Sequence, residues 1–243
     1  MTVSELADKL TRWIRGKVLA AGCRGVVVGM SGGLDSSVAA VLCHRAFPDV
    51  VLGVAMPCHS HPGDEEHARL VASRFAIPIE TVGLDDVFNV LLKILPGDST
   101  DPSARQRADA NLKPRLRMLT LYHIASRRRY LVVGSSNRDE LAIGYFTKYG
   151  DGGVDIMPLG GLTKSQVREL AGYLDIPRLV IDKPPSAGLW AGQTDEEDMG
   201  LSYEELDRYL ATGTASDGVR QKIAAMTAAS RHKRRPPPVA GFK

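Results

Sequence analysis

The chain has 243 residues, which is long enough to bury a full hydrophobic core and fits one α/β domain better than two. Its hydrophobic fraction of 44% and charged fraction of 24% are ordinary for a globular protein, and its net charge of +3 is too small to indicate a nucleic-acid partner. The three cysteines lack a CxxC spacing, which argues against a disulfide framework and a zinc ribbon. The sequence has neither a signal-type apolar stretch nor a membrane-length apolar run, so we expect a cytoplasmic protein without a membrane partner.

The first predicted element is a helix over residues 4–21. Apolar side chains recur there at helical spacing, with Ser4 as the predicted N-cap and Gly22 as the predicted stop. We expect this helix to cover one face of a sheet.

A buried strand, a tight turn and a second helix are predicted over residues 26–42. Three valines precede small residues, and the turn opens onto a helix N-terminus, where main-chain N–H groups and the helix dipole bind phosphate. Gly32 and Gly33 let the backbone approach an anion closely. Asp35 fits an anion site only if a hard cation such as Mg²⁺ bridges it to phosphate oxygens. The Gly-Lys-Ser/Thr triplet of a Walker A loop does not occur in the sequence.

Strands and helices alternate through the next hundred residues. The pattern predicts strands at 50–56, 77–82 and 130–134, and helices at 65–75, 87–95 and 111–129. Strand, helix and strand in this spacing imply right-handed parallel crossovers. We therefore expect a Rossmann-like, doubly wound parallel sheet with helices on both faces. Residues 96–103 are rich in helix breakers and are expected to form an exposed loop.

Thiol and imidazole groups cluster in residues 58–67, which makes a metal site one interpretation. The spacing matches no common zinc pattern, and Pro62-Gly63 marks a turn. We favour a loop above the nucleotide site that runs into the following helix.

Polar residues follow the predicted strand 130–134 directly. The carboxyl ends of parallel strands share one crevice, so this turn and the residue 31–36 loop are expected to face each other. Glu140 is then a candidate second carboxylate for Mg²⁺, and Ser135 a candidate ribose or phosphate contact. The arginines of the 111–129 helix either form a solvated face or direct guanidinium groups toward phosphates.

Residues 31–36, Ser-Gly-Gly-Leu-Asp-Ser, resemble the loop of the ATP pyrophosphatase (PP-loop) family, whose members split ATP between the α- and β-phosphates. From residue 134 onward the chain is similar to the NAD synthetase family. The matching strings are residues 144–153, 162–168, 185–190, 193–196 and 232–234, and they agree with that family in order and spacing over nearly the whole chain.

The resemblance implies a homodimeric PP-loop enzyme that adenylates deamido-NAD with ATP and amidates it to NAD. No glutaminase-like domain is attached, so free ammonia is the implied nitrogen source. The implied ATP contacts are Gly29, Met30, Ser31, Gly32, Gly33, Leu34, Asp35, Ser36, Ser135, Lys164 and Ser186. Asp35 and Glu140 would hold Mg²⁺, and Asp35 and Lys164 would be the catalytic residues. The implied deamido-NAD contacts are Arg115, Lys148, Asp155, His232 and Lys233.

Residues 1–243 are expected to form a single domain, in which residues 229–243 are a basic tail closing on the substrate site. On composition alone this tail resembles a disordered basic segment. Lys164 follows Thr163, a predicted N-cap, so an alternative to an ATP contact is a surface lysine in the first turn of a helix. A cation in that turn is unfavourable with respect to the helix dipole unless an anion is present. For Asp155, the alternative to a deamido-NAD contact is a loop carboxylate without a binding role.

The sequence departs from the family at three of these positions. Serines stand at 135 and 186 where threonine is frequent, which keeps the hydroxyl. Pro114 replaces a usual alanine, so either a helix starts there or Arg115 is presented differently.

The predicted reaction has two steps. The nicotinate carboxylate attacks the α-phosphorus of ATP and expels pyrophosphate, and ammonia then displaces AMP. Two rival functions are another PP-loop ligase, such as a GMP synthetase ATPase subunit or a tRNA-thiolating enzyme, and a non-catalytic nucleotide sensor. The lack of a CxxC and of a strongly basic composition weighs against tRNA thiolation, and intact Asp35, Glu140 and Lys164 weigh against a sensor.

Overall fold

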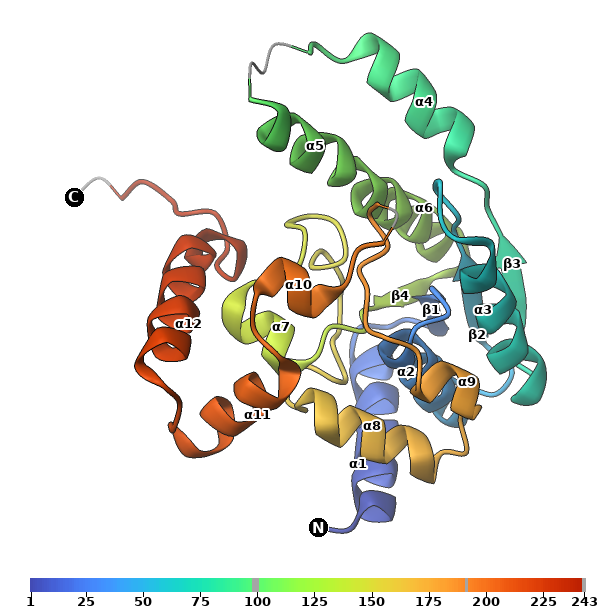
Figure 1. Ribbon diagram of the computed structural model, residues 1–243. Coiled ribbons are helices and arrows are strands. Elements are labelled where there is room, and N and C mark those ends of the chain that lie inside the picture. The colour runs from blue at the N-terminus through green and yellow to red at the C-terminus, as the bar shows by residue number, and fades with distance from the viewer. Residues whose placement is uncertain (98–100, 191, 242–243) are drawn as a thin grey trace.

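The computed structural model describes residues 1–97, 101–190 and 192–241. Its centre is a four-stranded parallel sheet (Figure 1) with the order β3-β2-β1-β4. The strands are β1 (Gly25–Gly29), β2 (Val51–Ala55), β3 (Ile79–Thr81) and β4 (Tyr130–Val133). In register, Val27 of β1 lies beside Leu52 on one side and Val132 on the other. The predicted parallel, doubly wound fold is confirmed.

The order of the strands reverses at β1. The chain leaves β1 toward β2 and β3, and it returns on the other side of β1 to form β4. The carboxyl ends of β1 and β4 are therefore neighbours from which the chain departs in different directions. Such a switch point opens a crevice at the carboxyl edge of the sheet, and ligands bind there in open α/β folds.

One face of the sheet is covered by helices from both ends of the chain. They are α1 (Val3–Ala20), α2 (Leu34–Ala46), α3 (Pro62–Arg74), α8 (Lys164–Tyr173) and α9 (Arg178–Ile181). Val26 and Val28 of β1 pack into this side, together with Ile14 of α1 and Leu170 of α8. Alternate residues of a strand point to opposite faces, so two of the three valines belong to this core.

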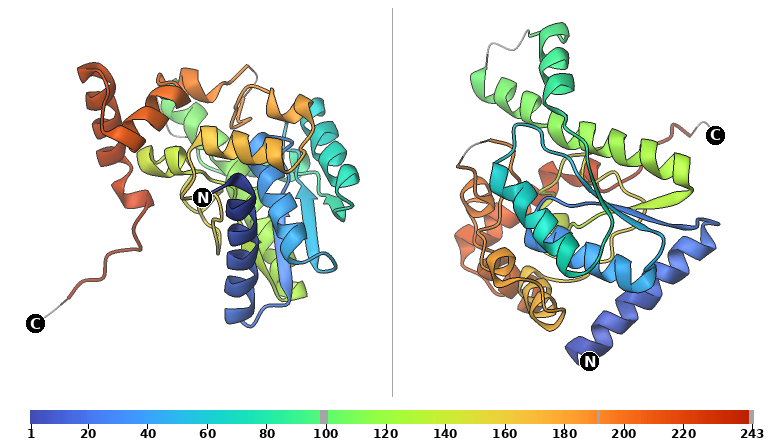
Figure 2. Two further views of the ribbon diagram at one scale, coloured as in Figure 1. Left: turned by 90° about the horizontal axis from the view of Figure 1, so that it is seen from below. Right: turned by 90° about the vertical axis from the view of Figure 1, so that its right-hand side faces the viewer.

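The opposite face is covered by α4 (Asp85–Ile94) and α6 (Leu112–Arg128), as Figure 2 shows from the side. Val27 of β1 and Val132 of β4 point to this side and pack with Phe88 of α4 and Leu121 of α6. The central strands are thus buried on both faces, which explains why they are continuous apolar runs.

A third, smaller core holds the C-terminal helices together. It is formed by α7 (Arg138–Ile143), α10 (Asp195–Met199), α11 (Tyr203–Thr212) and α12 (Asp217–Ala229), followed by the 3₁₀ helix η1 (Arg231–Lys233). Ile143, Met199, Leu206 and Ile223 are its buried centre. These helices stand beside β4 and so complete the crevice on that side (Figure 1).

One predicted helix cap and the end of one predicted loop are corrected. Thr2 caps α1 in place of Ser4, because its hydroxyl accepts from the Glu5 amide while the Glu5 carboxylate accepts from the Thr2 amide. The predicted 111–129 helix is preceded by a separate helix, α5 (Pro102–Ala110), which takes the end of the predicted 96–103 loop. Residues 98–100 of that loop lie outside the described residues.

Pro114 is the third residue of α6, directly after the break at Asn111. The first amides of a helix have no intrahelical acceptor, so a proline costs no hydrogen bond there. Of the two alternatives, the helix start is therefore confirmed. No helix among the described residues is long and apolar enough to span a membrane.

Candidate active site

A cleft of about 1230 Å³ opens at the carboxyl edge of the sheet, at the switch point between β1 and β4. Its walls come from the loop after β1, the end of β2, the facing sides of α5 and α6, the turn after β4, and residues 183–190. Segments far apart in sequence meet here because parallel strands bring all their carboxyl ends to one edge.

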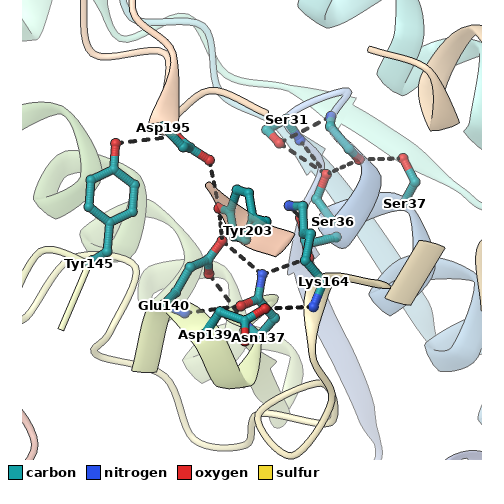
Figure 3. Close-up of polar contacts among 12 residues, drawn as sticks. Ser31, Ser36, Ser37, Asn137, Asp139, Glu140, Tyr145, Lys164, Asp195 and Tyr203 are labelled. Atoms are coloured by element: carbon teal, nitrogen blue, oxygen red, sulfur yellow. Dashed lines mark hydrogen bonds and ion pairs between the residues drawn. The ribbon is translucent and has the colours of Figure 1, made fainter. Parts of the chain in front are cut away.

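The loop after β1 is braced by its own serines (Figure 3). The Ser36 hydroxyl donates to the Gly33 carbonyl at 3.1 Å, and the Ser37 hydroxyl donates to the same oxygen at 2.8 Å. The Ser31 amide donates to the Ser36 Oγ at 3.2 Å. Gly33 is the N-cap of α2, with no side chain to occupy the helix terminus. The loop therefore presents a helix N-terminus to the cleft, as a phosphate site requires.

Gly32 has φ +72°, in the left-handed region, and a Cβ there would collide with the backbone oxygen of Asp64. Only glycine allows this close approach between the loop and the N-terminal end of α3. Gly33, by contrast, is extended, with φ −91°, and the close approach of this loop to an anion stays a prediction.

The carboxylates of Asp35 and Glu140 both accept from the side chain of Asn137, which Figure 3 shows beside Glu140. The Asn137 Nδ2 group donates to Asp35 Oδ1 at 3.1 Å and to Glu140 Oε1 at 3.0 Å. Asn137 is also the N-cap of α7, where a capping box with Glu140 fixes both residues at the start of the helix. The two predicted metal carboxylates thus share one cavity.

Lys164 completes this group from the other side of the cleft. It is the first residue of α8, is 4% exposed, and forms an ion pair with Asp35 Oδ2. Its Nζ also lies 4.8 Å from the centre of the Tyr203 ring. Burial alone lowers the pKa of the Lys164 ammonium, but Asp35 and Glu140 outweigh burial and raise it. The alternative of a surface lysine is wrong, because the adjacent carboxylates stabilise the buried charge.

Two oxygen ligands of this kind fit a magnesium ion. Mg²⁺ binds through one or two carboxylates, with water and substrate phosphates completing its shell. Burial, and next the neighbouring Asp35 carboxylate, raise the pKa of Glu140 well above its ordinary value. A divalent cation between the two would relieve this excess of negative charge.

A chain of tyrosines and carboxylates extends from Glu140 across the cleft (Figure 3). The Tyr203 hydroxyl donates to Asp195 Oδ2 at 2.9 Å and contacts Glu140 Oε1 at 3.3 Å. The Tyr145 hydroxyl donates to Asp195 Oδ1 at 3.2 Å. Burial raises the pKa of both tyrosines, and the nearby carboxylates raise it further, so both hydroxyls stay protonated donors.

The remaining predicted ATP contacts, Ser135 and Ser186, both line the cleft. Lys233 of η1 also lines it and is the one predicted deamido-NAD contact among the described lining residues. Its Nζ donates to the carbonyls of Gly144 and Phe146, at 2.9 and 2.8 Å. Residues 235–241 are exposed and lead away from the sheet (Figure 1).

The other predicted deamido-NAD contacts lie outside the lining of the cleft. Arg115 is exposed on α6, and its Nε donates to the Lys148 carbonyl at 3.3 Å, so these two residues are neighbours. Asp155 accepts from the Val132 amide at 2.8 Å and from the Tyr122 hydroxyl at 2.9 Å, so it braces the edge of β4. His232 is exposed. The structure does not gather these four in the cleft of one chain.

Sequence reasoning missed several members of the site. Asn137, Tyr203 and Tyr145 had no assigned role, and Asp195 was noted only as part of a string. Asn137 was detectable, because Asn three residues before Glu is a capping-box pattern. Asp139 was missed as well: its Oδ2 accepts from the Lys164 amide at 2.6 Å, and burial together with the Asp207 carboxyl raises its pKa to about 7.

The chain was compared with protein families and with known proteins. A family model described as NAD synthase matches residues 6–237. The NH3-dependent NAD⁺ synthetase of Carboxydothermus hydrogenoformans is 48% identical over 235 residues, covering 97% of this chain and 96% of the relative. The NH3-dependent NAD⁺ synthetase of Syntrophomonas wolfei is 44% identical over 248 residues, covering 99% of this chain and 97% of the relative.

Solved structures agree with these relatives. The NMN synthetase from Francisella tularensis has a TM-score of 0.94 at 34% identity and covers 100% of both chains. The NH3-dependent NAD synthetase from Campylobacter jejuni has a TM-score of 0.80 at 26% identity, covering 99% of this chain and 100% of that one. Together with the cleft geometry, these matches show that the chain belongs to the NAD synthase family.

Proposed function

We propose that this chain makes NAD from deamido-NAD, ATP and ammonia, releasing AMP and pyrophosphate. The NAD synthase family carries out this reaction, and relatives up to 48% identical bear the name NH3-dependent NAD⁺ synthetase. The observation that carries the proposal is the convergence of Asp35 and Glu140 on Asn137, beside Lys164, at the N-terminal end of α2. This arrangement suits the transfer of an adenylyl group from ATP.

The first step activates a carboxylate. A nicotinate carboxylate oxygen forms a bond to the α-phosphorus of ATP, pyrophosphate leaves, and a mixed anhydride with AMP results. Both reactants are anions, so catalysis consists mainly of positioning and charge neutralisation. Charge neutralisation and positioning come from the main-chain amides of the loop at residues 29–36 and from the Lys164 ammonium. Ser135 and Ser186 contact ATP from the facing walls of the cleft.

Asp35 and Glu140 are the residues that would hold Mg²⁺. When bound, the ion would neutralise phosphate oxygens and act as a Lewis acid toward the adenylyl group that is transferred. Asn137 keeps the two carboxylates directed at one point, and the raised pKa of Glu140 reflects the negative charge that a cation would offset.

The second step forms the amide. The ammonia nitrogen attacks the carbonyl carbon of the anhydride, the carbon–oxygen bond to AMP breaks, and nitrogen loses a proton. Ammonia does not displace oxide from a resting carboxylate, so adenylation supplies the leaving group that this step requires.

Deamido-NAD binding is proposed to involve two copies of the chain. Arg115, Lys148 and Asp155 lie outside the cleft, and Leu119, 68% exposed, stands one helical turn after Arg115. Tyr149, 61% exposed, follows Lys148. In a homodimer this partly apolar face would meet the partner subunit and put its charged groups near the second substrate.

The C-terminal tail is proposed to close on the same site. Lys233 already lines the cleft, and His232 and the basic residues after it would follow when the dinucleotide binds. We treat residues 1–243 as one catalytic domain acting in the cytoplasm.

The deciding experiment mixes the protein with ATP, Mg²⁺, ammonium and deamido-NAD and follows NAD, AMP and pyrophosphate. We expect one of each per turnover, and no NAD when ATP or ammonium is omitted. Asp35→Asn should lose pyrophosphate release, because it removes a metal carboxylate and the Lys164 ion pair. Wild-type pyrophosphate release by this variant would contradict the assigned metal role.

A second candidate substrate is the nicotinate mononucleotide in place of the dinucleotide. It is favoured by the TM-score of 0.94 to the NMN synthetase from Francisella tularensis, above the 0.80 to the NAD synthetase from Campylobacter jejuni. Measuring kcat/KM for both substrates with one preparation decides between them. A higher value for the mononucleotide would replace deamido-NAD in the proposal while leaving the chemistry unchanged.

A further inference from the structure

Arg117 is a cleft residue without a role in the reaction as described so far. It lies in the second turn of α6 and lines the cleft wall beside β2. Its Nε donates to the Met56 carbonyl at 3.1 Å, and its Nη2 donates to the Ser60 Oγ at 3.2 Å. These two nitrogens form one edge of the planar guanidinium, so the plane is held in a fixed orientation.

The guanidinium charge has no close counter-ion. Among the ion pairs of the described residues none includes Arg117, and the carboxylates that act on it, Asp151 and Asp64, do so from beyond ion-pair distance. Burial lowers its pKa. An arginine kept partly buried at a cleft without a carboxylate partner is positioned to interact with a ligand.

An apolar shelf lies beside Arg117. Met56 and Leu121 approach Gly29 so closely that a Cβ there would be 3.2 Å from Met56 Cε and 3.6 Å from Leu121 Cδ1. Met118 also lines the cleft and packs in one core with Met56 and Leu121. The shelf begins at the first residues of the phosphate-binding loop, so it lies on the β2 side of the triphosphate position.

We infer that Arg117 is a specificity-determining residue that stacks its guanidinium plane on the purine base of ATP. This inference rests on the proposed function. The Nε and Nη2 edge is already used by Met56 and Ser60, so bidentate binding of a phosphate through that edge is not available. Met56 and Ser60 use neither the face of the plane nor the edge at Nη1. An arginine face stacks on nucleobases, and the tripolyphosphate measurement below distinguishes stacking from an end-on phosphate contact through Nη1. The apolar shelf beside Arg117 supplies the apolar surroundings that a base prefers.

The test uses Arg117→Gln and Arg117→Lys, which keep a hydrogen-bond donor for Met56 but lose the guanidinium plane. We expect the KM for ATP to rise about tenfold in both variants. The KM for deamido-NAD should stay within about twofold, and kcat should fall much less than kcat/KM for ATP. Inhibition by inorganic tripolyphosphate, which has no base, should be unchanged.

The matched control is Arg127→Gln, an exposed arginine at the other end of α6. It should leave both KM values at the wild-type level. Thermal unfolding of each variant confirms that the fold is intact, and tripolyphosphate inhibition reports an intact phosphate site.

Three outcomes would overturn the inference. The first is an unchanged KM for ATP, and the second is a rise only in the KM for deamido-NAD. The third is an equal loss of ATP and tripolyphosphate binding, which would place Arg117 on the phosphates. Failure of the proposed function is distinguishable, because the wild-type protein would then form no NAD.

Discussion

Lys164 Nζ forms an ion pair with Asp35 Oδ2, although the two residues are 129 positions apart in the chain. The pair joins the first turns of α8 and α2, the helix that starts at the phosphate-binding loop. It thereby places a fixed positive charge beside a helix N-terminus and a buried carboxylate pair. This is the electrostatic arrangement that two anionic substrates require.

Replacing Lys164 by methionine is predicted to abolish most activity and to weaken the fold. Asp35 and Glu140 would lose their shared cation, and breaking such a buried pair costs about 3 kcal/mol. Pyrophosphate release should fall at least about a hundredfold. Urea unfolding and a pyrophosphate assay measure both effects, and Lys9→Met, at an exposed position on α1, is the control. Wild-type pyrophosphate release would refute a role for Lys164 in the first step.

Replacing Asn137 by alanine is predicted to raise the Mg²⁺ requirement. Asn137 donates to both carboxylates, and without it Asp35 and Glu140 repel each other and lose their common direction. Loss of such an orienting contact typically weakens metal binding about tenfold. Initial rates measured against free Mg²⁺ at saturating ATP reveal the shift. An unchanged Mg²⁺ dependence would show that the pair keeps its geometry without the amide.

Replacing Asp139 by asparagine is predicted to flatten the dependence of stability on pH. Burial and the Asp207 carboxyl raise the pKa of Asp139 from 3.8 to about 7 in the folded protein. The folded state therefore binds an extra proton between about pH 4 and pH 7, and the free energy of unfolding decreases as pH rises through that range. Asparagine imitates the protonated carboxyl, because its oxygen accepts from the Lys164 amide and its NH2 donates to Asp207.

The measurement for Asp139→Asn is urea unfolding at several pH values between about 5 and 8, the range in which the Asp139 carboxyl titrates in the folded protein. The variant should lose less stability than wild type toward pH 8. Its curve keeps some slope, since burial also raises the pKa of Asp151 and Asp195. Parallel curves for variant and wild type would mean that Asp139 does not titrate in this window.

Replacing Gly32 by alanine is predicted to damage both stability and ATP use. A side chain at φ +72° is strained, and its Cβ would collide with the backbone of Asp64. The cost in unfolding free energy is about 1–3 kcal/mol. Gly161→Ala is the control, because a Cβ at Gly161 meets nothing within 4 Å. Equal unfolding midpoints for the two variants would contradict the assigned strain.

The local elements were predictable because their causes lie within a few residues. Three valines before a small-residue turn specify strand, loop and helix, and the repeat of that pattern specifies a parallel sheet. The start of α6 was predicted at Asn111, but the helix α5 before it was missed, since Asn111 ends one helix and begins the next with no glycine at the break. Thr2 and Ser4 are both good caps by residue type, but Glu5 stands three residues after Thr2, so the capping-box pattern already favours Thr2, and the observed contacts with Glu5 agree with it.

The sequence by itself determined the glycine-containing loop after β1, the parallel α/β fold and the family, because each depends on short sequence strings and on the local spacing of hydrophobic residues. Only the tertiary structure decided which charged groups meet. Packing of α7 and α8 around the loop brings Asn137, Glu140 and Lys164 to Asp35, while Arg115 and Asp155 lie outside the lining of the cleft. These distances depend on strand order and on helix packing over more than a hundred residues, and no local propensity encodes them.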